Sequence, residues 1–387
     1  MKIFTRSSIF RRSKRNESYT IVTQARMIWL AARLVREGYS DEYRRIADHG
    51  LEFLLKKMWA SENGGFVWEV ERDGTTSKPN KHLYGQAFGL YALSEYYRAT
   101  ADEQAAEYAH ELVELLEAEA KDNEHGGYVE YFTPDWKPIT EGQTYLENIE
   151  PDWSPKESGD AVLDPSLKLT NTHLHLMEAF TTYYRAFGTD LGRRRLQELF
   201  DIVTNTVYRK QRGFCTDKYE PDWTPKLDDE AFRIVSYGHD LEGVWLAMEA
   251  ADALGKPTDL FEELFVTLWD YSLEYGYDDE HGGFYFYGGF DEPASFRVKA
   301  WWVQAECMTS ALRMYELTGE ERYFDVFRKT WDFIQEFHAD DEFGEWHSGV
   351  TDDLEPVGRK GAVYKAAYHN GRALIECIET LNRLSDT

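Results

Sequence analysis

The stretch Gly282-Gly283-Phe284 decides the fold, because near-copies of it recur along the chain. The copies are Gly64-Gly65-Phe66, Gly126-Gly127-Tyr128, Gly213-Phe214 and Gly344-Glu345-Trp346, so that successive turns lie 62, 87, 69 and 62 residues apart. Glycine permits the backbone angles of a tight turn, and the aromatic residue can cover the end of the repeat. Self-similarity at a regular period marks a repeat architecture, and this period has room for two helices and a hairpin.

Apolar residues recur at helical spacing between these turns, which predicts an all-α protein. We expect eleven helices, over residues 19–38, 40–59, 81–100, 102–121, 170–188, 190–208, 238–254, 257–275, 299–317, 320–338 and 366–384. In each pair the second helix carries more surface charge, whereas the first begins with unusual polar residues. This alternation predicts an inner ring of helices surrounded by an outer ring, with short β-hairpins between successive pairs.

Five of the inner helices begin with polar and aromatic side chains where a packed helix would carry an apolar stripe. Side chains three, four or seven residues apart share one helix face. The first of the five segments is Gln24-Ala25-Arg26, and the others contain Asn171 with His175 and Glu178, His239 with Glu242, Trp302 with Glu306, and His369 with Arg372. We therefore expect a common pocket where the inner helices begin. The partial positive charge of helix N-termini would suit a developing oxyanion there.

The composition favours one large domain and excludes two classes of partner. The chain has 387 residues, a formal net charge of −27 and no Pro/Gly/Ser-rich linker. The negative charge argues against nucleic acid or a membrane as partner, since phosphates attract positive charge. The 12 Trp, 25 Tyr and 22 Phe residues would suit a site that stacks on sugar rings. We expect a basic, poorly ordered segment over 1–18 and one domain over 19–387.

The cysteines and the apolar pattern predict a cytoplasmic protein. Cys215, Cys307 and Cys377 are far apart and match no metal or redox spacing, so we expect free thiols in a reducing compartment. No apolar run approaches the ~20 residues that a membrane span needs, and the N-terminus lacks the apolar run of a secretory signal. We expect a monomer or a homodimer.

Histidines are the strongest candidates for acid/base chemistry, because imidazole titrates nearest neutrality, at ~6.5. His239 leads, since Glu242 one turn later could orient its ring; the structural alternative is a helix-capping His with a surface Glu. A zinc site built from His173, His175 and His239 is disfavoured, because His-X-His on a helix spreads the rings over different faces and no cysteine accompanies them. We expect no metal and no cofactor, and we expect His173 to be a packing residue.

The other candidates have plain structural alternatives. Arg26 could bind a sugar oxygen or polarise a carbonyl, or it could form a buried ion pair. Trp301 and Trp302 could stack on a sugar or pack in the core, and for Tyr84, with neighbouring Phe88, the core is favoured. These alternatives lose weight when the candidates are taken together, because the unusual residues recur at the same place in successive repeats.

The connection 141–169 is long and polar, and it contains Pro151, Pro155 and Pro165. A loop of this length in a compact domain is usually functional or disordered. Because it directly precedes the Asn171 segment, it is a candidate lid over the pocket. The alternative is a surface excursion without function.

Four motifs resemble those of one known family. They are Asn171-Thr172-His173-Leu174-His175-Leu176-Met177-Glu178-Ala179, Ser236-Tyr237-Gly238-His239-Asp240-Leu241-Glu242, Trp301-Trp302-Val303-Gln304-Ala305-Glu306 and Tyr368-His369-Asn370-Gly371-Arg372-Ala373. From Val22 to the C-terminus the chain resembles the N-acylglucosamine 2-epimerase superfamily, and most closely its cellobiose 2-epimerase branch. The resemblance implies an (α/α)6 barrel, or toroid, that acts on the reducing-end sugar of a free saccharide without a metal or nucleotide.

The resemblance also assigns roles to residues. His239 and His369 match the family's two acid/base histidines. The residues that match its sugar-binding and supporting positions, or lie beside them, are Arg26, Tyr84, Asn171, His175, Glu242, Trp301, Trp302, Glu306, Tyr364 and Arg372.

Two features depart from the family pattern. The family has a further helix and a hairpin before the Gln24-Ala25-Arg26 segment, whereas about twenty residues precede it here. The first helix is therefore expected to be missing or atypical, and the barrel could be open on one side, be closed by a partner chain or reflect a truncated start. Cellobiose epimerases usually carry Trp five residues before the second histidine, where this chain has Tyr364. The smaller platform keeps monosaccharide substrates open.

We therefore predict a carbohydrate 2-epimerase that inverts C2 of a reducing-end aldose, of the cellobiose/lactose or mannose/glucose type, through an enediolate. An aldose–ketose isomerase, for instance mannose to fructose, starts with the same proton removal and is the alternative within the superfamily. Outside it, a glycoside hydrolase on the same barrel would need two opposed carboxylates, and the motifs offer histidines instead. A non-catalytic sugar-binding protein is the remaining alternative, because the first helix is expected to be missing or atypical.

Overall fold

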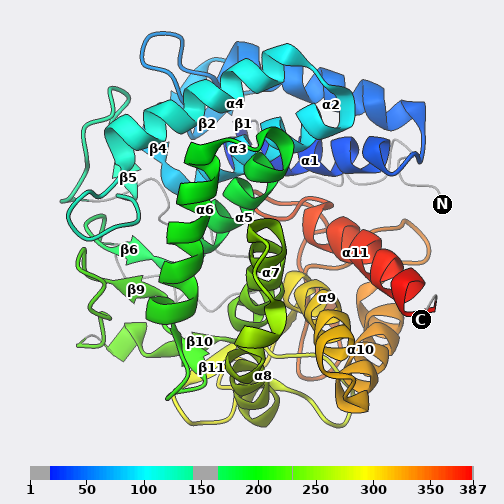
Figure 1. The fold of residues 1–387 in the computed structure, drawn as a ribbon. Helices are drawn as coiled ribbons and strands as arrows, with labels where there is room; N and C mark the ends of the chain where they lie inside the picture. The colour runs from blue at the N-terminus through cyan, green and yellow to red at the C-terminus, as the bar shows by residue number, and fades with distance from the viewer. Residues whose placement is uncertain (1–17, 143–163, 229, 386–387) are drawn as a thin grey trace.

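The helices of the computed structural model alternate between an inner and an outer ring (Figure 1). The structure describes residues 18–142, 164–228 and 230–385, and every structural statement below concerns these residues. The inner ring consists of α1 (Ile21–Arg36), α3 (Leu83–Thr100), α5 (Thr170–Phe187), α7 (Tyr237–Leu254), α9 (Trp301–Thr318) and α11 (Tyr368–Ser385). The outer ring consists of α2 (Asp41–Phe53), α4 (Glu103–Leu115), α6 (Asp190–Ile202), α8 (Glu262–Gly276) and α10 (Glu321–Phe333). The predicted all-α barrel, with eleven α-helices in the described residues, is confirmed.

Tight turns join each inner helix to the outer helix that follows it. α5 ends at Gly188, whose φ of 62° is left-handed, and Thr189 then caps α6 by accepting the Gly192 N–H at 3.1 Å. Asp102 caps α4 in the same way, with Ala105 N at 3.0 Å. A residue in the left-handed conformation, most often glycine, ends a helix at little energetic cost. A side-chain oxygen then accepts a free N–H group at the start of the next helix. At these two junctions the chain therefore reverses within two residues.

Short helical turns extend several outer helices. Single π-helical turns follow α2, α4, α6 and α10, at Leu54–Met58, Leu116–Ala120, Val203–Val207 and Ile334–His338. A 3₁₀ turn, Thr258–Phe261, precedes α8. With these turns included, the helical segments match the ranges expected from the sequence to within a few residues.

Antiparallel strand pairs close each repeat at the other end. The strand before an inner helix pairs with a strand after the next outer helix: β1 (Ser18–Thr20) with β2 (Glu69–Glu71), β4 (Lys81–His82) with β5 (Tyr131–Phe132), β6 (Lys168–Leu169) with β9 (Lys218–Tyr219), β10 (Ile234–Ser236) with β11 (Tyr287–Gly289), and β12 (Lys299–Ala300) with β13 (Gly349–Val350). Three further strands, β3 (Thr76–Lys78), β7 (Tyr208–Arg209) and β14 (Pro356–Val357), pair with β2, β8 (Phe214–Cys215) and β13 respectively. This pairing places the hairpins beside the starts of the inner helices.

The Gly-aromatic turns dock on the first turn of the next inner helix. The side-chain amide of Gln304 bonds to both backbone polar groups of Phe284 at 2.8 Å, and Gln86 does the same for Phe66. Gly283 has a φ of 81°, and a Cβ there would lie 2.5 Å from the Gln304 side chain, so only glycine fits. Because Gln304 and Gln86 both lie in first turns of inner helices, the two turns lie at the same end of the ring.

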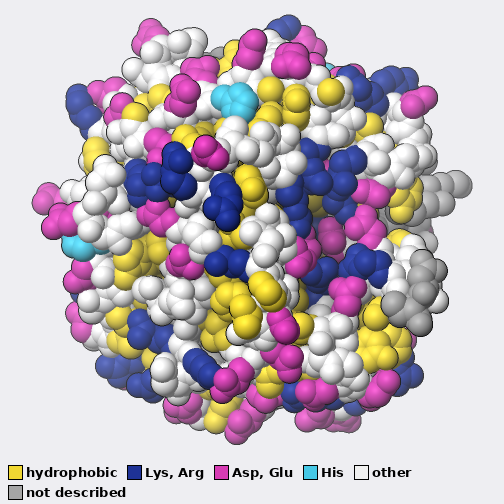
Figure 2. Space-filling model, in the orientation of Figure 1, with side chains coloured by type: hydrophobic (Ala, Val, Ile, Leu, Met, Phe, Trp, Pro, Cys, Tyr) yellow, Lys and Arg dark blue, Asp and Glu magenta, His cyan; other side chains and the backbone are white. Residues whose placement is uncertain are grey.

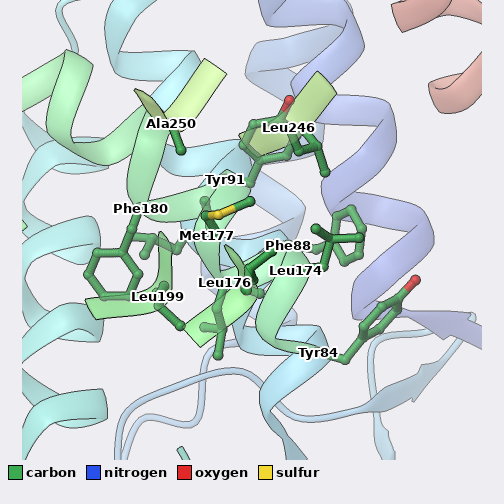
Figure 3. Packing of buried hydrophobic residues seen from close by; sticks show 14 of the residues in the cluster. Tyr84, Phe88, Tyr91, Leu174, Leu176, Met177, Phe180, Leu199, Leu246 and Ala250 are labelled. Atoms are coloured by element: carbon green, nitrogen blue, oxygen red, sulfur yellow. The ribbon is translucent and has the colours of Figure 1, made fainter. Parts of the chain in front are cut away.

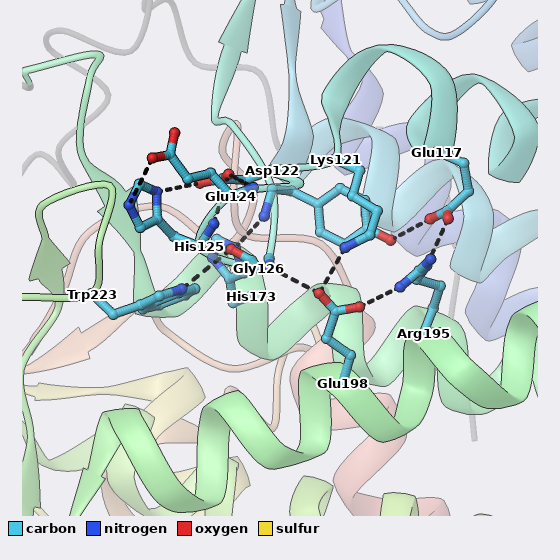
Figure 4. Close-up of polar contacts among 12 residues, drawn as sticks. Glu117, Lys121, Asp122, Glu124, His125, Gly126, His173, Arg195, Glu198 and Trp223 are labelled. Carbon is cyan, nitrogen blue, oxygen red and sulfur yellow. Dashed lines mark hydrogen bonds and ion pairs between the residues drawn. The ribbon is translucent and has the colours of Figure 1, made fainter.

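His173 occupies the corresponding place on α5 (Figure 4). Its Nε2 accepts the Tyr128 N–H at 3.1 Å, and its Nδ1 lies 2.9 Å from the Leu169 carbonyl. The buried Nζ of Lys168 also holds this turn, through Asp122 at 2.6 Å and the Gly126 carbonyl at 2.7 Å. Both ring nitrogens of His173 are therefore used in packing the turn, as expected.

Apolar packing and surface ion pairs join neighbouring repeats. Figure 3 shows Tyr91 of α3, Met177 and Phe180 of α5, and Leu199 of α6 packed against one another, all buried. Burying side chains of this size contributes about 1.5–3 kcal/mol each. Figure 4 shows α6 linked to the π-helical turn after α4 through Arg195, which pairs with Glu117 at 2.6 Å. Acidic and basic side chains are interspersed over the visible face in Figure 2, so the net charge is not gathered there into one patch.

The ring has its weakest junction between α11 and α1. Among adjacent inner helices this pair has the smallest contact, and no outer helix of the described residues lies between α10 and α2 in ring order. Arg33 of α1 bridges the junction to Glu376 and Glu379 of α11, at 3.3 and 2.6 Å. The outer helix expected to be missing or atypical is thus absent from the described part of the chain.

Two sequence expectations fall largely outside the described residues. They concern the order of segment 1–18, of which only Ser18 is described, and the lid over 141–169, of which 143–163 are not described. Ser18 already pairs with Glu71 in β1, one residue before the expected start of the domain. None of the described helices combines the length and apolar composition needed to cross a lipid bilayer.

Candidate active site

The second turns of the six inner helices meet at the barrel axis. The sixth residues of five inner helices and the fifth residue of α11 are Arg26, Phe88, His175, Glu242, Glu306 and Arg372, and all six are buried. Arg26 lies 4.3 Å from the Phe88 ring centre, and the Phe88 and His175 rings are 4.8 Å apart. A packed barrel would place apolar residues at these equivalent positions. The predicted convergence of unusual residues at the inner-helix starts is confirmed.

Arg372 binds three carboxylates at the bottom of this site. Its Nη2 donates to Glu242 Oε1 and to Glu306 Oε1, each at 2.8 Å, and its Nη1 donates to Glu178 Oε1. Burial opposes the charge on the guanidinium, but the carboxylates outweigh burial and raise the pKa of Arg372 well above its ordinary value. Arg372 is therefore a supporting residue that orders acidic side chains. We call Arg372, Glu178, Glu242 and Glu306 the floor.

His369 is held by the floor through Glu306. Its Nδ1 lies 2.6 Å from Glu306 Oε1, and Trp245 Nε1 donates to the other oxygen at 2.9 Å. A carboxylate accepts hydrogen bonds, so the ring proton sits on Nδ1 and the lone pair on Nε2 is free. Burial, with the positive charges of Arg26 and Arg372, lowers the pKa of His369 well below its ordinary value. His369 is thus an oriented, neutral imidazole with a free basic nitrogen.

His239 occupies a more open place. It is half-buried, its ring centre lies 4.9 Å from that of Trp302, and it has no hydrogen bond with any other described residue. The Trp302 ring also lies 5.8 Å from that of His369, so both histidines border the same space beside one indole. Burial lowers the pKa of His239 to about 4, and the nearby charge of Asp217 offsets part of that effect. We call the half-buried Asn171, His239, Trp302 and Tyr364 the rim.

The predicted pairing of Glu242 with His239 is wrong. Glu242 lies one turn deeper on α7, where its Oε1 accepts a hydrogen bond from Arg372 Nη2. The charged guanidinium is a stronger partner for a buried carboxylate than a neutral imidazole. The carboxylate that orients a histidine is Glu306, and the histidine that it orients is His369.

His175 and Glu178 form the pair that their spacing indicated. His175 Nδ1 lies 2.8 Å from Glu178 Oε2, and the Tyr368 hydroxyl donates to Glu178 Oε1 at 2.6 Å. Burial would raise the pKa of Glu178, but Arg372, His175 and Tyr368 outweigh it and bring that pKa to about 2. Glu178 is therefore ionised.

Arg26 is a buried cation without a carboxylate. Its side chain donates to the Tyr84 hydroxyl at 2.9 Å and to the Tyr364 carbonyl at 2.7 Å, and its Nε has no partner. It is only 2% exposed, and none of the described carboxylates pairs with it. The structural alternative of a buried ion pair is thus excluded for the described part of the chain. A charge buried in this way is costly unless an anion arrives.

The other residues predicted for the site are Tyr84, Asn171 and Trp301. Tyr84 is buried, yet its ring faces that of Tyr364 at 6.2 Å, so it belongs to the site as well as to the core. Asn171 lies at the rim with an unpaired Oδ1. Trp301 is buried in a core cluster between α9, α10 and α11, 6.3 Å from the His369 ring, so it supports that histidine from behind.

Three contributors were missed by the sequence analysis. Trp245 lies three residues after Glu242, on the same helix face, so spacing could have found it. Tyr368 was read only as part of a motif, although Arg26 packs 4.9 Å from its ring centre. Asp217 lies in the turn between β8 and β9, where helical periodicity gives no signal.

One described group has the donor chemistry of a metal site. Oxygens of Glu242 and Glu306 and a ring nitrogen of His369 lie within 4.8 Å of one another. The guanidinium of Arg372 already binds both carboxylates and supplies the positive charge there. We therefore assign the group to the floor and do not assign a metal to it.

One cavity lies elsewhere in the molecule. Its volume is about 640 Å³, and it runs along the outer helix α6, lined by Arg193, Arg194, Asp201 and Asn205 among others. None of the floor or rim residues lines it. We locate the site by the convergence of titratable groups and not by cavity size.

Comparison with known proteins places the chain in a family. The family model N-acylglucosamine 2-epimerase (GlcNAc 2-epimerase) matches residues 9–150 and 140–373. Cellobiose 2-epimerase of Ruminococcus albus is 30% identical, over 92% of this chain and 87% of its own length. D-mannose isomerase of Marinomonas mediterranea is 24% identical, over 93% and 86%.

Solved structures agree with these relatives. The structure of cellobiose 2-epimerase from Bacillus thermoamylovorans B4167 matches with a TM-score of 0.84 and 27% identity, over 95% of this chain and 89% of that chain. The comparisons confirm the predicted resemblance, the barrel fold and the enzyme class, an isomerase of the carbohydrate 2-epimerase type. The chain belongs to the N-acylglucosamine 2-epimerase family.

Proposed function

We propose that this protein inverts C2 of a reducing-end aldose by removing the C2 proton with one histidine and supplying a proton from the other. The observation that carries the proposal is the contact of one indole, that of Trp302, with both His239 and His369. Inversion requires proton transfer on both faces of C2, so two acid/base groups must border one substrate. The two histidines meet that requirement from separate helices, α7 and α11.

The chemistry begins with the open-chain sugar. Its aldehyde makes the C2 proton acidic, and a base removes that proton. The C–H electrons form the C1–C2 double bond, and the carbonyl oxygen becomes the oxyanion of an enediolate. A proton delivered to the opposite face of C2 restores the aldehyde with inverted configuration. Each acid/base group typically contributes ~10²–10⁴-fold.

His369 is suited to the role of the base. Its Nδ1 proton faces Glu306 at 2.6 Å, which leaves Nε2 to accept the C2 proton. Glu306 then stabilises the imidazolium that forms, as a buried carboxylate does in a Ser-His-Asp triad. His239, half-buried at the rim, is accessible to water and can relay a proton from water to the other side of C2. The roles reverse when the other epimer is the substrate.

Arg26 is suited to stabilise the enediolate. It brings into the site a positive charge that no described carboxylate pairs with directly, held by the Tyr84 hydroxyl and the Tyr364 carbonyl. A preorganised donor aimed at developing charge is worth about 2.7–4 kcal/mol in comparable sites. The N-termini of the inner helices add partial positive charge at the same end of the barrel.

The substrates that we propose are aldoses of the cellobiose/lactose or mannose/glucose type. A second candidate reaction is aldose–ketose isomerisation of a monosaccharide, which the smaller platform of Tyr364 would accommodate. D-mannose isomerases also occur among the relatives. That reaction shares the enediolate and differs in returning the proton to C1. A hydrolase is disfavoured, because Glu242 and Glu306 bind the same nitrogen of Arg372 and do not oppose each other.

The test is to incubate the protein separately with mannose, glucose, cellobiose and lactose and to separate the products. A 2-epimer supports the main proposal, and a ketose supports the second candidate. Release of a monosaccharide from a disaccharide would indicate a hydrolase. Binding without any product would support a non-catalytic sugar-binding protein. The control is the double variant His239→Asn/His369→Asn, which should retain the circular dichroism spectrum and lose the product.

We also propose a cytoplasmic location. The three cysteines Cys215, Cys307 and Cys377 are all free and buried, as expected in a reducing compartment. The expectation of a monomer or homodimer stays a prediction, which sedimentation in solution would decide.

A further inference from the structure

The three glutamates of the floor receive unequal numbers of hydrogen bonds. Glu178 and Glu306 each receive three, and both oxygens of each are occupied. Glu242 receives one, from Arg372 Nη2 to Oε1 at 2.8 Å. Its Oε2 is bonded to no described residue. A buried carboxylate with few donors is the least favourable place for a negative charge.

The charges of the site do not balance if all three glutamates are ionised. Three carboxylates then face two cations, Arg372 and the nearby Arg26. An oxygen of Glu242 lies within 4.8 Å of one of Glu306, and both side chains are buried. Two like charges this close in a buried site are not both retained, and one carboxyl group keeps its proton. One bound proton brings the group of five side chains to neutrality.

We infer that Glu242 holds this proton near neutral pH and that its free Oε2 donates a hydrogen bond to an oxygen of the bound sugar. Glu242 lies one turn below His239 on α7 and within 4.8 Å of a ring nitrogen of His369, so it borders the space between the histidines. The part that concerns sugar rests on the proposed function. The protonation does not.

The surroundings agree with a neutral Glu242. Burial and the neighbouring Glu306 raise its pKa well above the ordinary value, and Arg372 offsets only part of this. The titratable and charged groups that face it are Arg372, Tyr368 and His369 of α11, Glu306 of α9, Glu178 of α5, Tyr84 of α3 and Tyr208 of β7. A neutral acid can donate to a developing oxyanion, whereas an ionised carboxylate would repel it.

Infrared spectroscopy tests the protonation without any sugar. A protonated carboxyl group has its own carbonyl stretch, which shifts when water is exchanged for heavy water. At pH 7 we expect Glu242→Gln to lose one such band of the wild-type protein. The control is Glu249→Gln on the same helix, which removes a half-buried glutamate whose pKa is lowered by Arg185 and Arg313 against the effect of burial. This control should leave the band assigned to Glu242 in place.

A second variant keeps the inference testable if Glu242→Gln does not fold. Glu306→Gln removes the neighbouring negative charge, so Glu242 should ionise and the same band should disappear at pH 7. A full set of wild-type acid bands in Glu242→Gln, or persistence of the Glu242 band in Glu306→Gln, would overturn the inference. Because the band is read without sugar, a failure of the proposed epimerase activity would leave this result unaffected.

Discussion

The floor and the rim of the site surround the two histidines in opposite ways. On the floor side, His369 is buried and its Nδ1 is fixed by Glu306, which Arg372 and Trp245 hold in turn. On the rim side, His239 is half-buried, stacks beside Trp302 and has no hydrogen-bond partner among the described residues. The difference indicates one histidine whose protonation state is set by the protein and one that exchanges with water. Proton transfer on both faces of C2 would use one histidine of each kind.

The largest expected effect comes from removing the cation of the floor. Arg372→Met leaves three buried glutamates without their shared partner, and breaking a buried ion pair costs about 3–5 kcal/mol. The matched control is Arg383→Met on the same helix, whose ion pair with Glu316 is exposed and should contribute about 0–1 kcal/mol. Chemical denaturation measures both. Equal losses in the two variants would contradict the role given to the floor.

The next prediction compares the losses of turnover when the carboxylate beside each histidine is removed. Glu306→Gln removes the acceptor that fixes the His369 tautomer, and we expect turnover to fall roughly 10²-fold or more. Asp217→Asn removes a charge that acts on His239 through space, and we expect less than about a tenfold loss. Steady-state kinetics on whichever sugar is turned over gives both numbers. A larger loss for Asp217 than for Glu306 would reverse the comparison.

The lowered pKa of His239 should make the stability of the protein depend on pH. Burial holds the pKa of His239 at about 4 in the folded protein, below its ordinary 6.5. Because the fold favours neutral His239, this stability is fully present above pH 6.5 and is lost as pH falls toward 4. Thermal unfolding of wild type and His239→Asn should therefore diverge over this range, by about 1–3 kcal/mol. Parallel curves would mean that His239 titrates normally.

The smallest effect concerns specificity at the rim. Tyr364→Trp enlarges the aromatic face, and one additional stacking contact is worth about 0.5–1.5 kcal/mol, or roughly two- to tenfold. The ratio of kcat/KM for cellobiose to that for mannose should rise by this factor. An unchanged ratio would show that Tyr364 does not contact the distal sugar.

Much of the fold could be predicted because each repeat carries its own Gly-aromatic turn sequence. The turn at Gly282-Gly283-Phe284 needs glycine for its backbone angles, and each copy marks the end of a helix pair. Polar residues at the starts of inner helices indicated where the barrel axis would be. The same spacing argument found His175 with Glu178, since both lie on one helix.

The connections between helices could not be predicted in this way. Arg372 and Glu178 are 194 residues apart, and helical spacing says nothing of neighbours across the ring. For the same reason Glu242 was matched with His239 on its own helix, although the stronger partner came from α11. Asp217 lies in a turn without periodicity. Its position near His239 follows only from the folded chain.

The most direct test of the two-histidine account is proton incorporation from solvent. The wild type should be incubated with mannose, glucose or cellobiose in heavy water and the product examined by nuclear magnetic resonance. We predict deuterium at C2 of the product aldose, because His239 exchanges with water, and a ~10²–10⁴-fold loss of turnover in His239→Asn and in His369→Asn. Near-normal turnover in the double variant, or a 2-epimer that retains the original proton at C2, would contradict the account.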